Sequence, residues 1–64
     1  MSYNFHAYNG HTFNEAIELQ LFMESVRNSG YALDKQCSTY ETRVYRNSKE
    51  KITFNVVNRT VEIE

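Results

Sequence analysis

The C-terminal part of the chain alternates apolar and polar residues with the period of a half-buried β-strand. The apolar positions of this stretch are Ile52, Phe54, Val56, Val61 and Ile63. A two-residue hairpin loop at Asn58-Arg59 would place Val56 opposite Val61. Phe54 would then lie opposite Ile63, and all five apolar side chains would share one face of the sheet.

A further strand is predicted from Tyr40 to Asn47, and the length of the loop around Ser48 decides which of its faces joins the apolar face. An odd number of loop residues adds Tyr40, Thr42 and Val44 to that face. An even number adds Glu41, Arg43 and Tyr45 instead. With the odd loop, the opposite face gathers cations, an aromatic ring and an amide, namely Arg43, Tyr45, Lys51 and Asn55.

The segment from Phe13 to Ser29 is predicted to be the helix. Thr12 is a suitable N-cap, and Glu15 stands at the spacing of a capping box, in which two backbone N–H groups gain side-chain acceptors. Gly30 can adopt the left-handed conformation that often follows the end of a helix. These signals predict a helix over residues 13–29.

This predicted helix has two apolar stripes at helical spacing. The broad stripe, suited to packing on a sheet, contains Ala16, Leu19, Phe22, Met23 and Val26. The second stripe contains Phe13, Ile17 and Leu21. A single sheet cannot cover both stripes, so the second is predicted to contact the N-terminal arm, another copy of the chain or a different protein.

The remaining segments complete an α+β fold. Residues 1–11 are interpreted as an N-terminal arm, with Tyr3 to Tyr8 extended or forming an edge strand before the turn at Asn9-Gly10. Residues 31–37 are predicted to be the first strand after the helix, with Tyr31, Leu33 and Cys37 alternating inward. The fold class is therefore one α-helix on a three- to four-stranded antiparallel meander, in a single domain of residues 1–64.

Composition and charge argue against several classes of function. The net charge of −1 gives no general attraction to nucleic acid or to a membrane surface, and no apolar run is long enough to span a bilayer. One cysteine excludes an intrachain disulfide, and Cys37 with His6 and His11 is too small a set for an ordinary zinc site. We therefore expect no catalytic residue, cofactor or metal. Without a signal peptide, the expected location is the cytoplasm, or the host cytoplasm if the protein is viral.

The order of elements carries a resemblance to a known family. The predicted helix ends in Asn28-Ser29-Gly30-Tyr31, Ala32-Leu33-Asp34-Lys35-Gln36 follows, and strands come at Tyr40–Asn47 and from Ile52. This order resembles that of HicA-type toxins, small mRNA interferases with a fold like that of double-stranded-RNA-binding domains. The resemblance implies topology without catalysis, because the strand that carries their histidine has Ser38-Thr39-Tyr40-Glu41 here, and their usual second helix is missing.

These patterns favour a small non-enzymatic binding or inhibitor protein. We expect the stripe of Phe13, Ile17 and Leu21 to bind a protein partner, or a second copy of the chain in a homodimer. The seven asparagines suggest an AT-rich coding sequence, as in phages and mobile elements, and hence an accessory acting on a host macromolecule. The alternative is a nucleic-acid-binding module that uses the polar sheet face, with Arg43 and Lys51 on phosphates and Tyr45 on a base.

Overall fold

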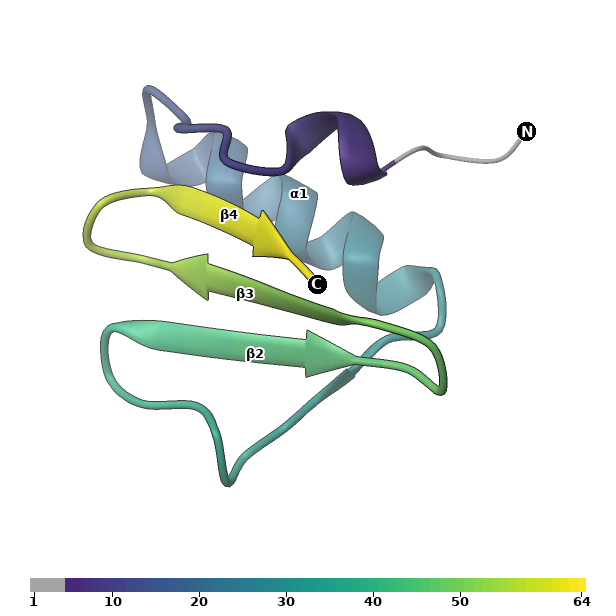
Figure 1. Ribbon diagram of the computed structural model, residues 1–64. Helices are drawn as coiled ribbons and strands as arrows, with labels where there is room; N and C mark the ends of the chain where they lie inside the picture. Colours follow the sequence, from purple (N-terminus) through teal and green to yellow (C-terminus); the bar gives the residue numbers. More distant parts are fainter. Residues whose placement is uncertain (1–4) are drawn as a thin grey trace.

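The computed structural model describes residues 5–64, in which one α-helix packs on a four-stranded antiparallel sheet (Figure 1). The elements, in chain order, are the 3-10 helix η1 (Phe5–Tyr8), α1 (Ala16–Asn28), β1 (Ala32–Leu33), β2 (Thr42–Arg46), β3 (Lys51–Asn55) and β4 (Thr60–Ile63). The strands lie side by side in the order β1-β2-β3-β4. The predicted α+β class and antiparallel meander are confirmed.

The hairpin of β3 and β4 differs from the prediction in the length of its loop. Phe54 lies opposite Val61, so the loop spans the four residues 56–59. The predicted two-residue loop was wrong, because the Asn55 carboxamide oxygen accepts hydrogen bonds from the backbone N–H groups of Val57 and Asn58 and closes a wider turn. The shift of two residues preserves the side-chain alternation, so the predicted apolar face is retained.

The hairpin of β2 and β3 has the register with an even loop. Arg43 lies opposite Phe54 and Tyr45 lies opposite Ile52, which leaves residues 47–50 as the loop. The odd loop was wrong, since the Asn47 carboxamide oxygen accepts the N–H groups two and three residues ahead and closes a four-residue turn. Val44 consequently lies on the outer face of the sheet, where it is nevertheless buried.

The predicted strand over residues 31–37 is shorter in the structure. Only Ala32–Leu33 pairs with β2, because Asp34 begins a turn in which its carboxylate accepts the backbone N–H groups of Gln36 and Cys37. Cys37 is exposed rather than inward-facing. The chain then follows the edge of β2, where the Ser38 hydroxyl accepts the N–H of Val44.

Helix α1 begins three residues after the predicted start, at Ala16. Glu15 is the N-cap, without a side-chain cap bond, so the capping box at Thr12 does not form. Thr12 instead forms a β-bridge with Thr60, because long-range pairing with β4 takes the place of the local cap. The predicted C-terminal end is confirmed, since α1 ends at Asn28 and Gly30 has a φ of +99°.

The N-terminal segment closes the free edge of β4. The Gly10 N–H donates to the Val61 carbonyl and the Val61 N–H donates to the His11 carbonyl. The predicted edge pairing therefore falls on residues 10–13, whereas Phe5–Tyr8 is a 3-10 helix rather than an extended arm. Figure 1 shows this segment running beside β4, across the sheet from β1. Tyr3, where the predicted arm begins, lies outside the described residues.

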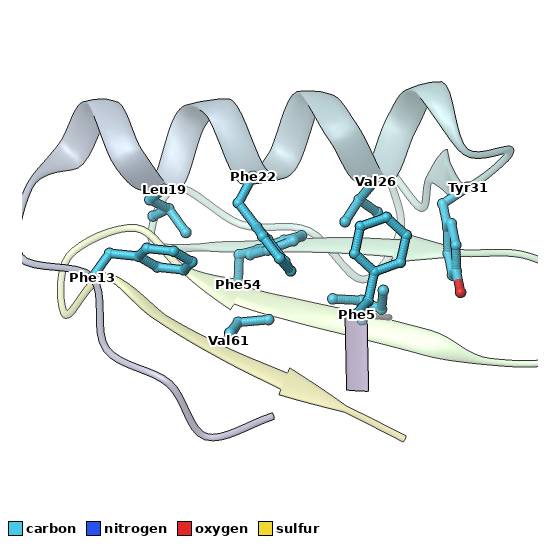
Figure 2. Close-up of a cluster of buried hydrophobic side chains, with 9 residues drawn as sticks. Phe5, Phe13, Leu19, Phe22, Val26, Tyr31, Phe54 and Val61 are labelled. Atoms are coloured by element: carbon cyan, nitrogen blue, oxygen red, sulfur yellow. The ribbon is translucent and has the colours of Figure 1, made fainter. Parts of the chain in front are cut away.

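The core lies between α1 and the sheet (Figure 2). The Phe22 ring lies 5.8 Å from the ring of Phe54, and Phe5 packs edge-on against Phe22 at 5.5 Å. Phe54 is completely buried, as predicted, and Val56 is partly buried against the same cluster. The predicted broad stripe of α1 supplies three buried residues, Leu19, Phe22 and Val26, while its Ala16 is exposed.

Candidate binding surface

The outer face of α1 carries two large aliphatic side chains that the fold does not cover. Ile17 is 54% exposed and Leu21 is 55% exposed. They are one turn apart, so they lie next to each other on the helix surface. The inner face of the same helix carries Leu19, Phe22 and Val26, each no more than 5% exposed. The sheet therefore uses one side of α1 and leaves the other available.

The structure separates Phe13 from the other two residues of the predicted stripe. Phe13 precedes α1, and its side chain is only 6% exposed. Its ring packs against Phe22 at 5.4 Å and is stacked 6.1 Å from Tyr8. The grouping of Phe13 with Ile17 and Leu21 on one helix face was wrong, because it assumed a helix that begins at residue 13.

Phe13 nevertheless contributes to a groove that adjoins Leu21. This depression, of about 260 Å³, runs between α1 and the N-terminal segment. We name it the aromatic groove, and it is lined by Tyr8, Phe13, Glu18, Leu21, Phe22 and Ser25. The rings of Tyr8 and Phe22 lie 4.8 Å apart within it. The exposed aliphatic pair and the groove thus form one continuous apolar region through Leu21.

The N-terminal wall of the aromatic groove is held by bonds to three parts of the sheet. The Asn9 carboxamide oxygen accepts the Ile63 N–H at 2.9 Å, and the Arg59 Nε donates to the Phe13 carbonyl at 3.0 Å. The imidazole Nε2 of His6 lies 2.8 Å from a carboxylate oxygen of Glu50. The wall is therefore built before any partner binds, which lowers the entropic cost of association.

Glu50 also holds the end of α1 in place. The Tyr31 hydroxyl donates to its other carboxylate oxygen at 2.9 Å. Burial, together with the hydrogen bond and negative charge of Glu50, raises the pKa of Tyr31 above its usual value of 10.0. A phenol that keeps its proton in this way is a structural donor at neutral pH. Glu50 therefore connects η1, the chain after α1 and the β2–β3 turn.

The apolar region has an acidic border. Glu18 and Glu24 stand three residues before and three residues after Leu21, and Glu15 is exposed at the helix N-cap. Arg27 is the cation of this helix. Three carboxylates against one guanidinium give residues 15–28 a net charge of −2. The surface around Ile17 and Leu21 is therefore negative, although the whole chain is nearly neutral.

The alternative site on the polar sheet face is not assembled as predicted. Arg43 and Tyr45 lie on the face that packs against α1, whereas Lys51 and Asn55 alternate onto the outer face. Each of the first three also has a structural partner. The Arg43 guanidinium donates to the carbonyls of Thr39 and Tyr40, the Tyr45 ring packs on Phe54, and Lys51 pairs with Glu64 at 3.1 Å.

On the outer face of the sheet, the cations Arg46 and Lys51 lie beside the β2–β3 turn, where Arg46 pairs with Asp34 and Lys51 pairs with Glu64. A separate shallow depression on this face is lined by Thr42, Thr53, Asn55, Asn58, Thr60 and Glu62. These side chains offer hydroxyl, amide and carboxylate groups but neither a cation nor an aromatic ring. This depression therefore lacks the combination of positive charge and stacking platform that single-stranded nucleic acids require.

The described residues contain neither a metal-ligand cluster nor a membrane-spanning helix. Within residues 5–64, no three side chains of histidine, cysteine, aspartate or glutamate are grouped so that they could hold a metal ion. His11 is in edge-on contact with Phe13 and Tyr8, so it belongs to the aromatic cluster. No helix in the described part of the chain is long and apolar enough to cross a bilayer.

Comparison of the chain with protein-family models, with curated proteins and with solved structures finds no match in any of the three.

Sequence reasoning placed Ile17 and Leu21 on a helix face that the sheet does not cover, as the structure shows, but it missed the aromatic groove beside them. Tyr8 and Phe22 were assigned to an extended arm and to the core stripe, with no contact between them. The available signal was the density of aromatic residues before the helix, where Phe5, Tyr8 and Phe13 precede a helix that already carries its own apolar stripe. Such a segment has more apolar surface than a solvated arm needs, which indicates packing against the helix.

Proposed function

We propose that this protein is a non-enzymatic binding protein that engages another protein through the outer face of α1 and the aromatic groove. The observation that carries the proposal is the exposure of Ile17 and Leu21, each above one half, on a helix whose opposite face already packs on the sheet. Contiguous exposed apolar surface with a polar border is typical of protein interaction sites.

The energetics require the groove as well as the helix face. Burying the exposed halves of Ile17 and Leu21 contributes about 2 kcal/mol in total, taking about half the value of a fully buried aliphatic side chain for each. The loss of translational and rotational freedom on association costs roughly 4–15 kcal/mol. Two side chains alone do not offset that cost. A stable complex therefore needs an anchor side chain of the partner inside the aromatic groove.

The sheet edges support binding through the helix rather than through strand addition. The edge of β4 is already paired with residues 10–13. On the opposite side of the sheet, the edge strand β1 has only two residues. The rest of β2 is covered by the chain that follows β1, since Thr42 exchanges bonds with Thr39 and Val44 bonds to Ser38 and Asp34. Partners that add a strand need unpaired backbone groups at an edge. Binding through the apolar surface of α1 is therefore favoured over strand addition.

We place this binding activity in an accessory role of the phage or mobile-element kind, in which a small protein inhibits or redirects a host macromolecule. The asparagine-rich composition supports that origin. The small size and the preformed groove are consistent with a protein that acts by binding to the surface of a larger protein.

The test compares capture by three versions of the tagged protein. The first is the parent, the second is Ile17→Glu with Leu21→Glu, and the third is the matched control Ala16→Glu with Gln20→Glu. The control adds the same two charges one turn apart at exposed positions on another side of α1. We expect the parent and the control to retain the same stoichiometric partner, and the Ile17/Leu21 variant to lose it. Equal capture by all three would show that this surface is not the binding site.

A further inference from the structure

The charges that border the apolar surface restrict the chemistry of what binds there. This inference rests on the proposed function. Glu18 lines the aromatic groove, and Glu24 lies on the other flank of Leu21, in a depression that it shares with Arg27. Among residues 5–64, neither carboxylate forms a salt bridge. Two exposed carboxylates therefore lie on opposite sides of Leu21, and within the described structure Glu24 is not paired even with Arg27, three residues ahead of it. Both carboxylates can pair with a cation from outside the chain.

A second copy of the chain does not supply cations for Glu18 and Glu24. In a two-fold dimer that packs two copies of Leu21 together through antiparallel α1 helices, each flank of Leu21 lies beside the same flank of the other copy, so Glu18 approaches Ser25 and Glu24 approaches Ile17 and Gln20. Such a dimer gives neither carboxylate a cation to pair with. The net charge of −2 over residues 15–28 opposes any closer face-to-face packing of these helices. The occupant is therefore better sought in a chain of opposite charge.

The shape of the surface defines the apolar part of the occupant. Ile17 and Leu21 form a ridge of two side chains one turn apart, about 6 Å along the helix axis. The aromatic groove runs beside this ridge between α1 and the N-terminal segment. An amphipathic helix presents apolar side chains at i, i+3 or i+4, and i+7, so one residue can enter the groove while its neighbours cover the ridge.

We propose that the partner contributes a basic amphipathic helix, whose apolar residues pack on Ile17, Leu21 and the aromatic groove and whose flanking lysines or arginines pair with Glu18 and Glu24. The apolar contacts supply most of the affinity. The charge pairs set orientation and exclude acidic helices, since exposed pairs of this kind change an equilibrium by only about two- to fivefold each.

The experiment selects binders from a displayed library of 18-residue helical peptides. Apolar positions at i, i+4 and i+7 vary among Leu, Ile, Met and Phe, and the flanking positions vary equally among Lys, Glu and Gln. Selection on the parent protein is followed by counter-selection on the Ile17→Glu/Leu21→Glu variant. We expect lysine to exceed glutamate several-fold at the flanking positions of the recovered peptides. The best peptide should bind the Glu18→Gln/Glu24→Gln variant about 5- to 20-fold more weakly than the parent.

The outcomes separate this inference from the proposed function. Recovery of peptides that need Ile17 and Leu21 but show no preference for lysine would overturn the charge requirement and leave the binding surface in place. Enrichment of glutamate, or equal affinity for the parent and the Glu18/Glu24 variant, would overturn it in the same way. Failure to recover any peptide that depends on Ile17 and Leu21 would overturn the inference, and the capture experiment would still decide the proposed function separately.

Discussion

The two faces of α1 carry similar aliphatic side chains, which are buried on one face and exposed on the other. On the inner face, Leu19 and Val26 are 3% and 0% exposed against the sheet. On the outer face, Ile17 and Leu21 are more than half exposed, although they belong to the same aliphatic class. Hydrophobicity alone therefore does not reveal what a residue of this helix does. The comparison predicts that inner-face changes alter the stability of the fold, whereas outer-face changes alter binding and leave stability almost unchanged.

The largest expected effect lies in the sheet beneath the inner face. Phe54→Ala should lower the free energy of unfolding by about 3–5 kcal/mol, because it removes a fully buried ring that contacts Phe22 and Tyr45. A domain of this size has a margin of similar magnitude, so the variant should be largely unfolded at 25 °C. Urea unfolding followed by circular dichroism measures this. A loss below 1 kcal/mol would contradict the position of Phe54 in the core.

Phe13 tests the boundary between the two faces. As a buried residue that packs on Phe22, Phe13→Ala should cost about 3 kcal/mol. As an exposed member of a helix stripe it would cost less than about 0.5 kcal/mol. Thr12→Ala is the companion variant, because a capping residue would cost about 1 kcal/mol and an exposed non-capping residue much less. We expect a large loss of stability for Phe13→Ala and a small one for Thr12→Ala. The opposite result would support a helix that begins at Phe13 with Thr12 as its N-cap.

Arg43 and Lys51 test the alternative function on the sheet. Arg43→Ala should destabilise the protein by about 1 kcal/mol, because the guanidinium holds the carbonyls of Thr39 and Tyr40. Lys51→Ala removes an exposed ion pair with Glu64 and should change stability by less. Neither change should matter to nucleic acid binding, since we expect no salt-dependent binding of RNA or DNA at low salt. A steep salt dependence that both variants reduce would instead support the nucleic-acid alternative.

The smallest expected effect concerns the turn that begins at Asp34. Partial desolvation acts to raise the pKa of this carboxyl, but the hydrogen bonds from Cys37, the charge of Arg46 and the Gln36 N–H outweigh it and hold the pKa below its ordinary value of 3.8. The stabilisation is therefore complete above pH 3.8 and is lost as the pH falls from there through the lower folded-state pKa.

Unfolding measured from pH 6 to pH 2 checks this sign. Asp34→Asn should remove part of the acid-induced loss of stability, so that the difference between the parent and the variant shrinks as the pH falls. A difference that is constant across this range would contradict the lowered pKa of Asp34.

The sequence allowed the fold class and part of the helix to be predicted, because these depend on local signals. Gly30 after the helix and the alternation around Phe54 were sufficient for the end of α1 and for the apolar face of β3. The β3–β4 register was wrong by two residues, yet the face was right, since side-chain direction depends only on whether the shift is even.

The β2–β3 register could not be decided from the sequence, because both faces of this segment offer apolar residues. Val44 and Tyr45 are adjacent in the chain and point to opposite faces. The structure places Tyr45 against Phe54 and buries Val44 on the outer face. Likewise, the start of α1 and the aromatic groove depend on pairing between residues 10–13 and β4, which are about fifty positions apart. Local patterns carry no information about such a pairing.

The most direct test of the central claim measures mass and thermal stability of the Ile17→Glu/Leu21→Glu variant beside the parent and the Ala16→Glu/Gln20→Glu control. The account predicts a monomer in all three cases, with unfolding free energies within about 0.5 kcal/mol of one another, because exposed side chains contribute little to the fold. A markedly lower melting temperature of a monomeric Ile17/Leu21 variant would show that the outer face of α1 belongs to the fold. A parent dimer that this variant alone dissociates would show that a second copy of the chain occupies the surface.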